Sequence, residues 1–161
     1  MSNTLALFWN LAATDREARI DASNELVNAL LQQSSDFGNV DDTTLMESPL
    51  SEQVTDDEVA TAEQRIDDAN TQDVNYAIRR LVRGLASPRE NARIGFAVAL
   101  SGLLTHLKTV SANDVLVLLL KYSVVHGNMN GQEVRDLQFA LLFGIYAVSY
   151  THLRAHETSL H

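Results

Sequence analysis

The chain has 161 residues, with 12 Lys and Arg, 21 Asp and Glu, no Cys and a formal net charge of −9 at neutral pH. The lack of Cys excludes a disulfide framework, a thiolate metal site and a cysteine nucleophile. The longest purely apolar run, Val115 to Leu120, is too short to cross a bilayer, so we expect a soluble protein. Residues 1–78 hold three Arg against sixteen acidic residues, whereas residues 79–161 hold nine Lys or Arg against five. Only the second part could attract nucleic acid.

Residues 1–33 predict a first pair of helices. A short, strongly apolar helix comes first, and Thr14 followed by Glu17 has the spacing of a capping box that opens a second helix to about Gln33. In residues 34–55 the periodicity stops, and Ser, Asp and Asn dominate without any basic residue. Such a segment buries too little apolar surface to offset its ordering entropy, so we predict a disordered acidic insertion.

Helical pattern resumes at Asp56 and continues through a helical-repeat region, residues 56–147. After a helix with an acidic start, Thr71 can cap a second helix whose apolar residues recur at i, i+3, i+4, i+7, i+8 and i+11. These residues are Val74, Ala77, Ile78, Leu81, Val82 and Leu85. They predict one continuous buried face.

The segment Ser87-Pro88-Arg89-Glu90 predicts the start of the next helix. It offers serine as the N-cap, proline as the first helical residue and glutamate as the third. Ser111 with Asp114 opens a further helix, and its apolar run Val115–Leu120 predicts burial on all sides. Residues 127–131 form a turn before the last helix.

The pattern therefore predicts about seven helices with short connections and an all-α fold. Consecutive antiparallel pairs of this length are typical of armadillo or HEAT-like helical repeats, here the start of an α-solenoid. A closed helical bundle is the alternative, because no internal repeat is strong enough to separate the two.

No catalytic, cofactor-binding or metal site is predicted. Residues 127–131 lack the Lys-Ser/Thr step of a phosphate-binding loop. The Asp-Asp pairs at 41–42, 56–57 and 67–68 lie in a loop, at a helix start and late in a helix. They are not expected to converge on two metal ions as polymerase carboxylates must, and we interpret them as solvated charge.

Five arginines within fifteen residues make the one candidate contact surface. They are Arg79, Arg80, Arg83, Arg89 and Arg93. The first three centre on the side opposite the apolar face, with Tyr76 among them, and the last two share a face of the next helix. This pattern fits either a solvated helix face paired to the acidic first part, or a surface that contacts phosphates or an acidic peptide.

The last residues resemble something other than a protein. The stretch from Val148 to Thr158, VSYTHLRAHET, is similar to one reading frame of a transposase adaptor used in sequencing libraries. We therefore expect residues 148–161 to be an adaptor-like, non-native tail and residues 56–147 to be truncated. His152 and His156, spaced like a zinc pair, are excluded from function on this ground.

Three blocks of the sequence resemble the Myb-binding protein 1a / DNA polymerase phi family. They are LFWNLAATDREARIDASNELVNALL (residues 7–31), DVNYAIRRLVRGLASPRENARIGFAVALSGLL (residues 73–104) and NGQEVRDLQFALLFGIYA (residues 130–147). The arginine-rich middle block is the most specific, and the acidic insertion before it is most like fungal members. One departure is Ala140-Leu141, where the family pattern has a Gly-Arg step.

The resemblance implies a nuclear, mainly nucleolar scaffold of helical repeats that acts in rRNA transcription and ribosome biogenesis. It also implies transcription regulation and DNA- or RNA-associated roles. From the residues themselves we expect no cofactor and no membrane partner. The implied partners are proteins of the nucleolar transcription or pre-ribosome machinery, and rDNA or rRNA through the five arginines. A DNA polymerase, as the family name suggests, and a generic helical adaptor are the alternatives.

Overall fold

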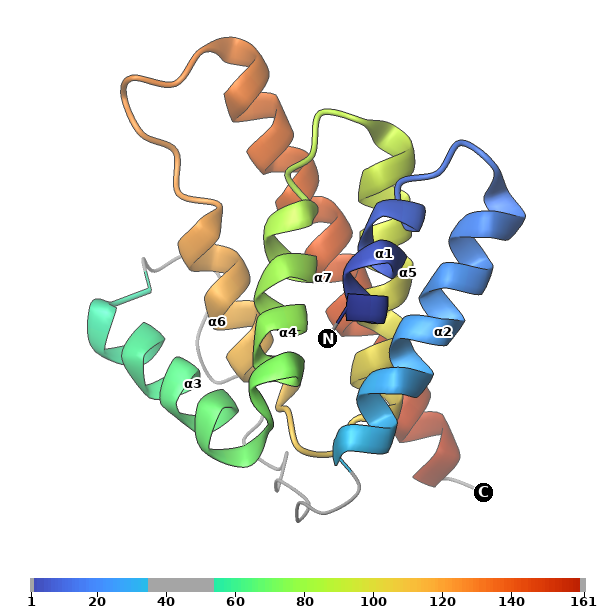
Figure 1. The fold of residues 1–161 in the computed structure, drawn as a ribbon. Coiled ribbons are helices and arrows are strands. Elements are labelled where there is room, and N and C mark those ends of the chain that lie inside the picture. The colour runs from blue at the N-terminus through green and yellow to red at the C-terminus, as the bar shows by residue number, and fades with distance from the viewer. Residues whose placement is uncertain (1, 35–53, 160–161) are drawn as a thin grey trace.

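The computed structural model describes residues 2–34 and 54–159, with side chains described for residues 4–34 and 54–151. This part of the chain contains seven α-helices and no strand, which confirms the predicted all-α fold (Figure 1). The helices are α1 (Ser2–Asn10), α2 (Arg16–Ser34), α3 (Asp56–Ala69), α4 (Gln72–Gly84), α5 (Glu90–His106), α6 (Ala112–Tyr122) and α7 (Gly131–Ser159). Residues 35–53 of the predicted insertion lie outside the described residues. No helix in the described part is long and apolar enough to span a membrane.

The helices form three hairpins, α1–α2, α4–α5 and α6–α7. The second members α2, α5 and α7 lie in one row, with α5 packed between the other two, while α4 and α6 pack side by side in a second row (Figure 1). Because each hairpin leaves an apolar face for the next one to cover, this arrangement is consistent with the start of a helical repeat.

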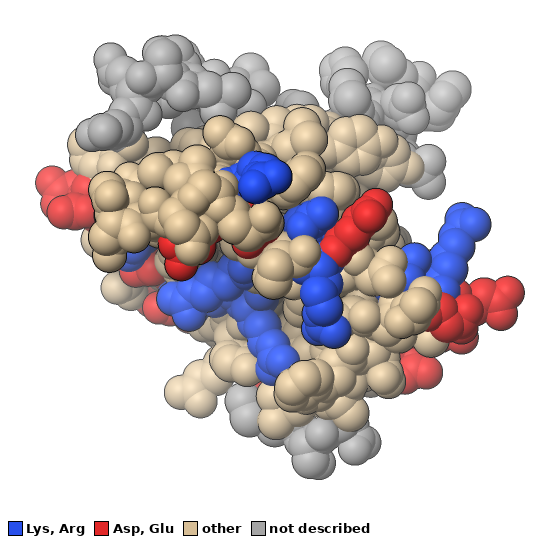
Figure 2. All heavy atoms as spheres, turned by 90° about the horizontal axis from the view of Figure 1, so that it is seen from above, with Lys and Arg blue, Asp and Glu red and all other residues tan. Residues whose placement is uncertain are grey.

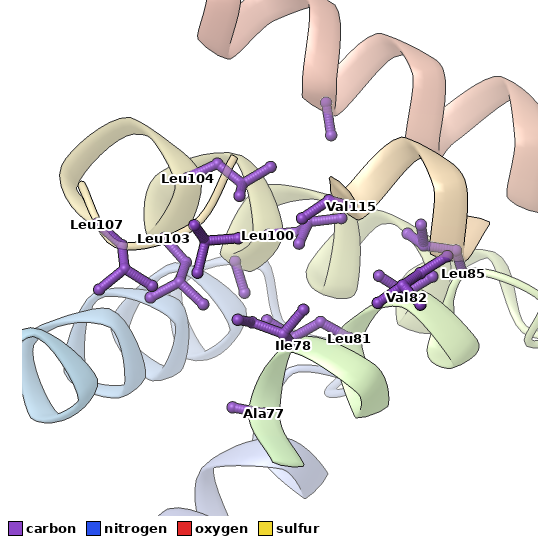
Figure 3. Close-up of a cluster of buried hydrophobic side chains, with 14 of the residues drawn as sticks. Ala77, Ile78, Leu81, Val82, Leu85, Leu100, Leu103, Leu104, Leu107 and Val115 are labelled. Atoms are coloured by element: carbon purple, nitrogen blue, oxygen red, sulfur yellow. The ribbon is translucent and has the colours of Figure 1, made fainter. Parts of the chain in front are cut away.

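The core is built around the predicted apolar face of α4 (Figure 3). All six residues of that face are buried, and none is more than 1% exposed. They meet Leu100, Leu103 and Leu104 of α5 and Val115 of α6 in one continuous cluster. Burying one such aliphatic side chain stabilises a fold by about 1.5–3 kcal/mol, so the burial of this face stabilises the fold strongly.

Two of the predicted helix starts differ in detail from the structure. The capping box of Thr14 and Glu17 is not formed, because α2 begins one residue later and Asp15 Oδ2 accepts the backbone N–H of Ala18 at 3.1 Å. An unpredicted capping box joins Thr55 to Glu58 at the start of α3. The Thr71 cap of α4 is confirmed, with its hydroxyl accepting from the N–H of Val74.

The start of α5 is the second correction. The helix begins at Glu90, and Arg89 rather than Ser87 occupies the N-cap position, without a side-chain cap. Ser87 Oγ instead accepts the N–H of Arg89 at 3.3 Å, and the Ser87 carbonyl accepts from the guanidinium of Arg93 at 3.0 Å. These bonds hold the loop in a turn that delays the helix by two residues.

Helix α3 packs mainly against α6, although it precedes α4 in the chain. The buried side chain of Asn70 donates to the carbonyls of Ile66 at 2.9 Å and Thr109 at 3.3 Å, and it accepts from the Thr109 hydroxyl. Arg65 of α3 also pairs with the buried Asp114 of α6 at 3.2 Å. These polar contacts hold α3, whose first turn is acidic, against α6.

Helix α7 continues past Ala147 into the adaptor-like tail. Val148 is 5% exposed and belongs to the core cluster, and the buried Thr151 donates its hydroxyl to the Ala147 carbonyl at 2.9 Å. Val148 and Thr151 of the tail therefore pack with the fold, whereas Ser149 and Tyr150 are exposed. The adaptor origin of residues 148–161 stays a prediction.

Two glycines of α5 give a matched test of the packing. A Cβ on Gly95 would overlap the backbone carbonyl of Leu11, whereas the nearest atom to a Cβ on Gly102 is Val27 Cγ2 at 3.4 Å. We expect Gly95→Ala to lower the free energy of unfolding by about 1–3 kcal/mol or more through this overlap. Gly102→Ala should raise it by roughly 0.5–1 kcal/mol, because alanine loses less backbone entropy in a helix. Urea denaturation measures both, and equal effects would contradict the packing of α5 on the end of α1.

A second pair of variants tests whether the tail packs. Val148→Ala removes buried methyl groups and should lower the free energy of unfolding by about 1–2 kcal/mol. The neighbouring Ser149 is exposed, so Ser149→Ala should change it by less than about 0.5 kcal/mol. If both substitutions are silent in thermal and urea unfolding, the packing of Val148 in the core is contradicted.

Candidate nucleic-acid interface

Because the apolar face of α4 is buried, Arg79, Arg80 and Arg83 on the same helix point outward. These three arginines are not equally free to bind a partner. Arg79 is held by Asp67 of α3, with a distance of 2.9 Å between Nη2 and Oδ1, and its side chain is only 23% exposed. Pairing to the acidic first part of the chain was one of the two alternatives that the sequence left open, and Arg79 follows it. The charge of Arg79 is already compensated within the fold.

Arg80 lies against aromatic rings. Its Cζ is 4.4 Å from the ring centroid of Phe8, and Nη1 donates to the Tyr76 hydroxyl at 2.9 Å. The rings of Phe8 and Tyr76 meet edge to face with centroids 6.1 Å apart, so this group ties α1 to α4. Arg80 is half-buried and keeps its charge without a carboxylate partner among the described residues.

Arg83 and Arg89 are exposed. The Cζ of Arg83 lies 4.6 Å from the ring centroid of Tyr122 of α6, which supports the guanidinium from one side. Arg89 stands at the N-cap of α5. Within the described part of the chain neither arginine forms an ion pair. Both therefore present uncompensated positive charge to solvent.

The prediction that Arg93 lies on the surface is wrong. Arg93 is 8% exposed, its Nη1 donates to the Ser87 carbonyl, and its Cζ lies 4.3 Å from the ring centroid of Phe139. Its Nε has no hydrogen-bond partner in the described part of the chain. The i, i+4 spacing from Arg89 misled the prediction, because Arg89 precedes the helix and Arg93 points into the contact between α5 and α7. Arg93 is structural.

The three remaining arginines, Arg80, Arg83 and Arg89, form what we call the arginine surface. Arg83 lies in the last turn of α4 and Arg89 in the loop that follows it, at the end of the molecule where the three hairpins turn (Figure 1), and Arg80 lies about one turn before Arg83 on the outer side of α4. Figure 2 views this end and shows Lys and Arg side chains gathered near its middle. The aromatic supports Phe8 and Tyr122 come from distant segments, so sequence spacing could not find them; Tyr76, one turn before Arg80, could be found.

The described residues offer little for metal chemistry. No three His, Asp or Glu side chains among them lie close enough to hold a metal ion. In the pair at 67–68, Asp67 binds Arg79 and Asp68 accepts from Gln64 at 2.7 Å.

A separate groove between α5 and α7, about 490 Å³ in volume, carries no charged side chain. Its lining is Ile94, Ala97, Val98, Ser101, Phe143, Tyr146, Ala147 and Tyr150. The groove offers no cation to pair with a phosphate group, unlike the arginine surface.

Replacing Arg93 and Arg89 separately tests their assignment. Arg93→Ala removes a buried hydrogen bond and the contact with Phe139, so the free energy of unfolding should fall by about 1–3 kcal/mol. Arg89→Ala should change it by less than about 0.5 kcal/mol, because its side chain is exposed. Thermal and urea unfolding of both variants measure the difference. An unchanged free energy of unfolding for Arg93→Ala would contradict the structural role of Arg93.

Comparison with known proteins places this structure in a family. The family model for DNA polymerase phi matches residues 76–160. The rDNA transcriptional regulator pol5 of Schizosaccharomyces pombe is 45% identical over 102 residues, which cover 63% of this chain and 11% of that protein. Two further relatives are 27% identical: the Myb-binding protein 1A-like protein of Danio rerio covers 90% of this chain, and Myb-binding protein 1A of Rattus norvegicus covers 89%.

The chain spans only 9% and 8% of the length of those two relatives. No solved structure matches it. Because the family model covers more than half of the residues, including all of α5 and α6, the chain belongs to the DNA polymerase phi family.

Proposed function

We propose that this chain is part of a nuclear, mainly nucleolar scaffold that regulates rRNA transcription and takes part in ribosome biogenesis. The proposal is supported by family membership and by the names of the relatives, one a regulator of rDNA transcription, one a Myb-binding protein and one a Myb-binding protein-like protein. Three stacked helical hairpins suit such a role, because armadillo or HEAT-like repeats present extended surfaces to several partners.

We propose no catalytic role for this scaffold. Phosphoryl or nucleotidyl transfer needs carboxylates that converge on metal ions, and in the described part Asp67 is occupied by Arg79. The names of the relatives describe regulators and binding proteins rather than polymerases. We therefore propose no polymerase activity for this chain.

The arginine surface contacts the phosphate backbone of rDNA or rRNA. The observation that carries this step is the pair Arg83 and Arg89, two exposed guanidiniums without carboxylate partners in a chain whose net charge is −9. A strongly acidic chain repels nucleic acid as a whole, so binding requires a local surface of opposite sign. Arginine forms the bidentate bonds that phosphate groups favour.

A generic helical adaptor that binds only proteins is the second candidate. The uncharged groove between α5 and α7 favours it, since an apolar groove selects apolar side chains over phosphates. The two candidates differ in their response to salt. Backbone binding weakens steeply as salt rises, whereas apolar binding does not.

Arg89→Ala and Lys108→Ala form a matched pair for the test. Each removes one exposed positive charge, but Lys108 follows α5 and so lies at the opposite end of that helix from Arg89. Affinity for duplex DNA and for single-stranded RNA is measured by fluorescence anisotropy over a range of salt. Arg89→Ala should weaken binding and flatten the slope of log affinity against log salt by about 0.7–0.9, and Lys108→Ala should leave the slope unchanged. Equal effects, or binding that salt does not change, would favour the adaptor.

A further inference from the structure

The loop between α4 and α5 carries a serine followed by proline, Ser87-Pro88, between two arginines of the arginine surface. A serine directly before proline is the feature that proline-directed protein kinases recognise. Ser87 is half-buried, and Pro88 and Arg89 are exposed. We propose that Ser87 is a phosphorylation site of such a kinase, and that its phosphate switches off nucleic-acid binding by the arginine surface. The regulatory part of this inference rests on the proposed function.

A phosphate on Ser87 would lie near backbone N–H donors and arginine side chains. Its hydroxyl oxygen already accepts the backbone N–H of Arg89 at 3.3 Å, and its carbonyl accepts from Arg93 Nη1 at 3.0 Å. Its own N–H donates to the carbonyl of Gly84 at 3.1 Å, in the turn after Arg83. A phosphate on this oxygen therefore starts within reach of the Arg89 backbone, on the loop that carries Arg89 and directly follows the last turn of α4, which carries Arg83.

Two groups near Ser87 lack a hydrogen-bond partner that a phosphate could supply. The N-cap residue of α5 makes no side-chain cap bond, whereas the N-cap side chains of α3, α4 and α6 do. Arg93 is 8% exposed, and its Nε has no hydrogen-bond partner in the described part. Three phosphate oxygens are strong acceptors, and negative charge at a helix N-terminus is stabilising. Phosphorylation is thus expected to cap α5 rather than disrupt it.

The chemistry is a simple transfer. The Ser87 oxygen forms a bond to the γ-phosphorus of ATP as the bond to the β-phosphate oxygen breaks. ADP leaves, and the hydroxyl proton passes to the base of the kinase. The product carries about −1.5 to −2 charges at neutral pH, which is enough to offset the two exposed arginines. Nucleic-acid phosphates then meet a surface that is neutral or acidic.

The experiment uses the full chain with Ser48→Ala, which removes the other Ser-Pro sequence, Ser48-Pro49. The purified protein is incubated with a proline-directed kinase and ATP, and intact-mass and fragment spectra locate the phosphate. Addition of Ser87→Ala or Pro88→Ala should abolish the modification. A peptide of residues 83–93 serves as the control for kinase activity.

The expected result combines two opposite effects. Phosphorylation at Ser87 should raise the melting temperature by about 1–4 °C through the new cap. It should also lower affinity for duplex DNA or single-stranded RNA at low salt by at least about tenfold. A loss of affinity caused by damage to the fold would instead lower the melting temperature, so the pair of readouts separates a switch from a disruption.

Three outcomes would overturn the inference. They are modification of the peptide without modification of the folded chain, an unchanged affinity after modification, and a fall in the melting temperature. If the unmodified chain binds no nucleic acid, the proposed function fails instead, and modification of Ser87 with a raised melting temperature still stands as a separate result.

Discussion

The need to bury the apolar face of α4 determines the rest of the structure. Six side chains on one side of this helix and its C-cap are removed from water mainly by α5 and α6, and no other helix in the described part offers so regular a face. Once that side faces inward, the arginines between the apolar positions must point outward, because both sets share one helix. Arg80 and Arg83 of the arginine surface are therefore placed by the core, and the loop that follows α4 adds Arg89.

The parts of the fold that depend on local pattern could be predicted from the sequence. The apolar face of α4, the Thr71 cap and the buried run of α6 all follow from side-chain spacing within one helix. The packing of α3 on α6 could not be predicted, since it depends on Asn70 and Thr109, which lie 39 residues apart. The start of α5 also escaped prediction, because Arg93 reaches back to Ser87 and competes with the cap.

The same distinction applies to the arginines. Their placement opposite the apolar face was predictable, but their partners come from other elements. Arg79 is neutralised by α3, Arg80 rests on α1, and Arg93 is buried against α7. Of the five, only Arg83 and Arg89 are exposed without an ion pair in the described part, so the pattern reduces to a small surface centred on the loop between α4 and α5. The acidic first part of the chain thus shapes this surface by pairing with one of its neighbours.

The most direct test of the account is to map the contact on the protein itself. Backbone amide spectra of the isotope-labelled chain, recorded during titration with single-stranded RNA and with duplex DNA, report each residue near the ligand. Shifts should concentrate in the last turn of α4 and in residues 85–89, and they should disappear at high salt. Shifts confined to the groove between α5 and α7, or no shifts at concentrations where binding is measured by other means, would contradict it.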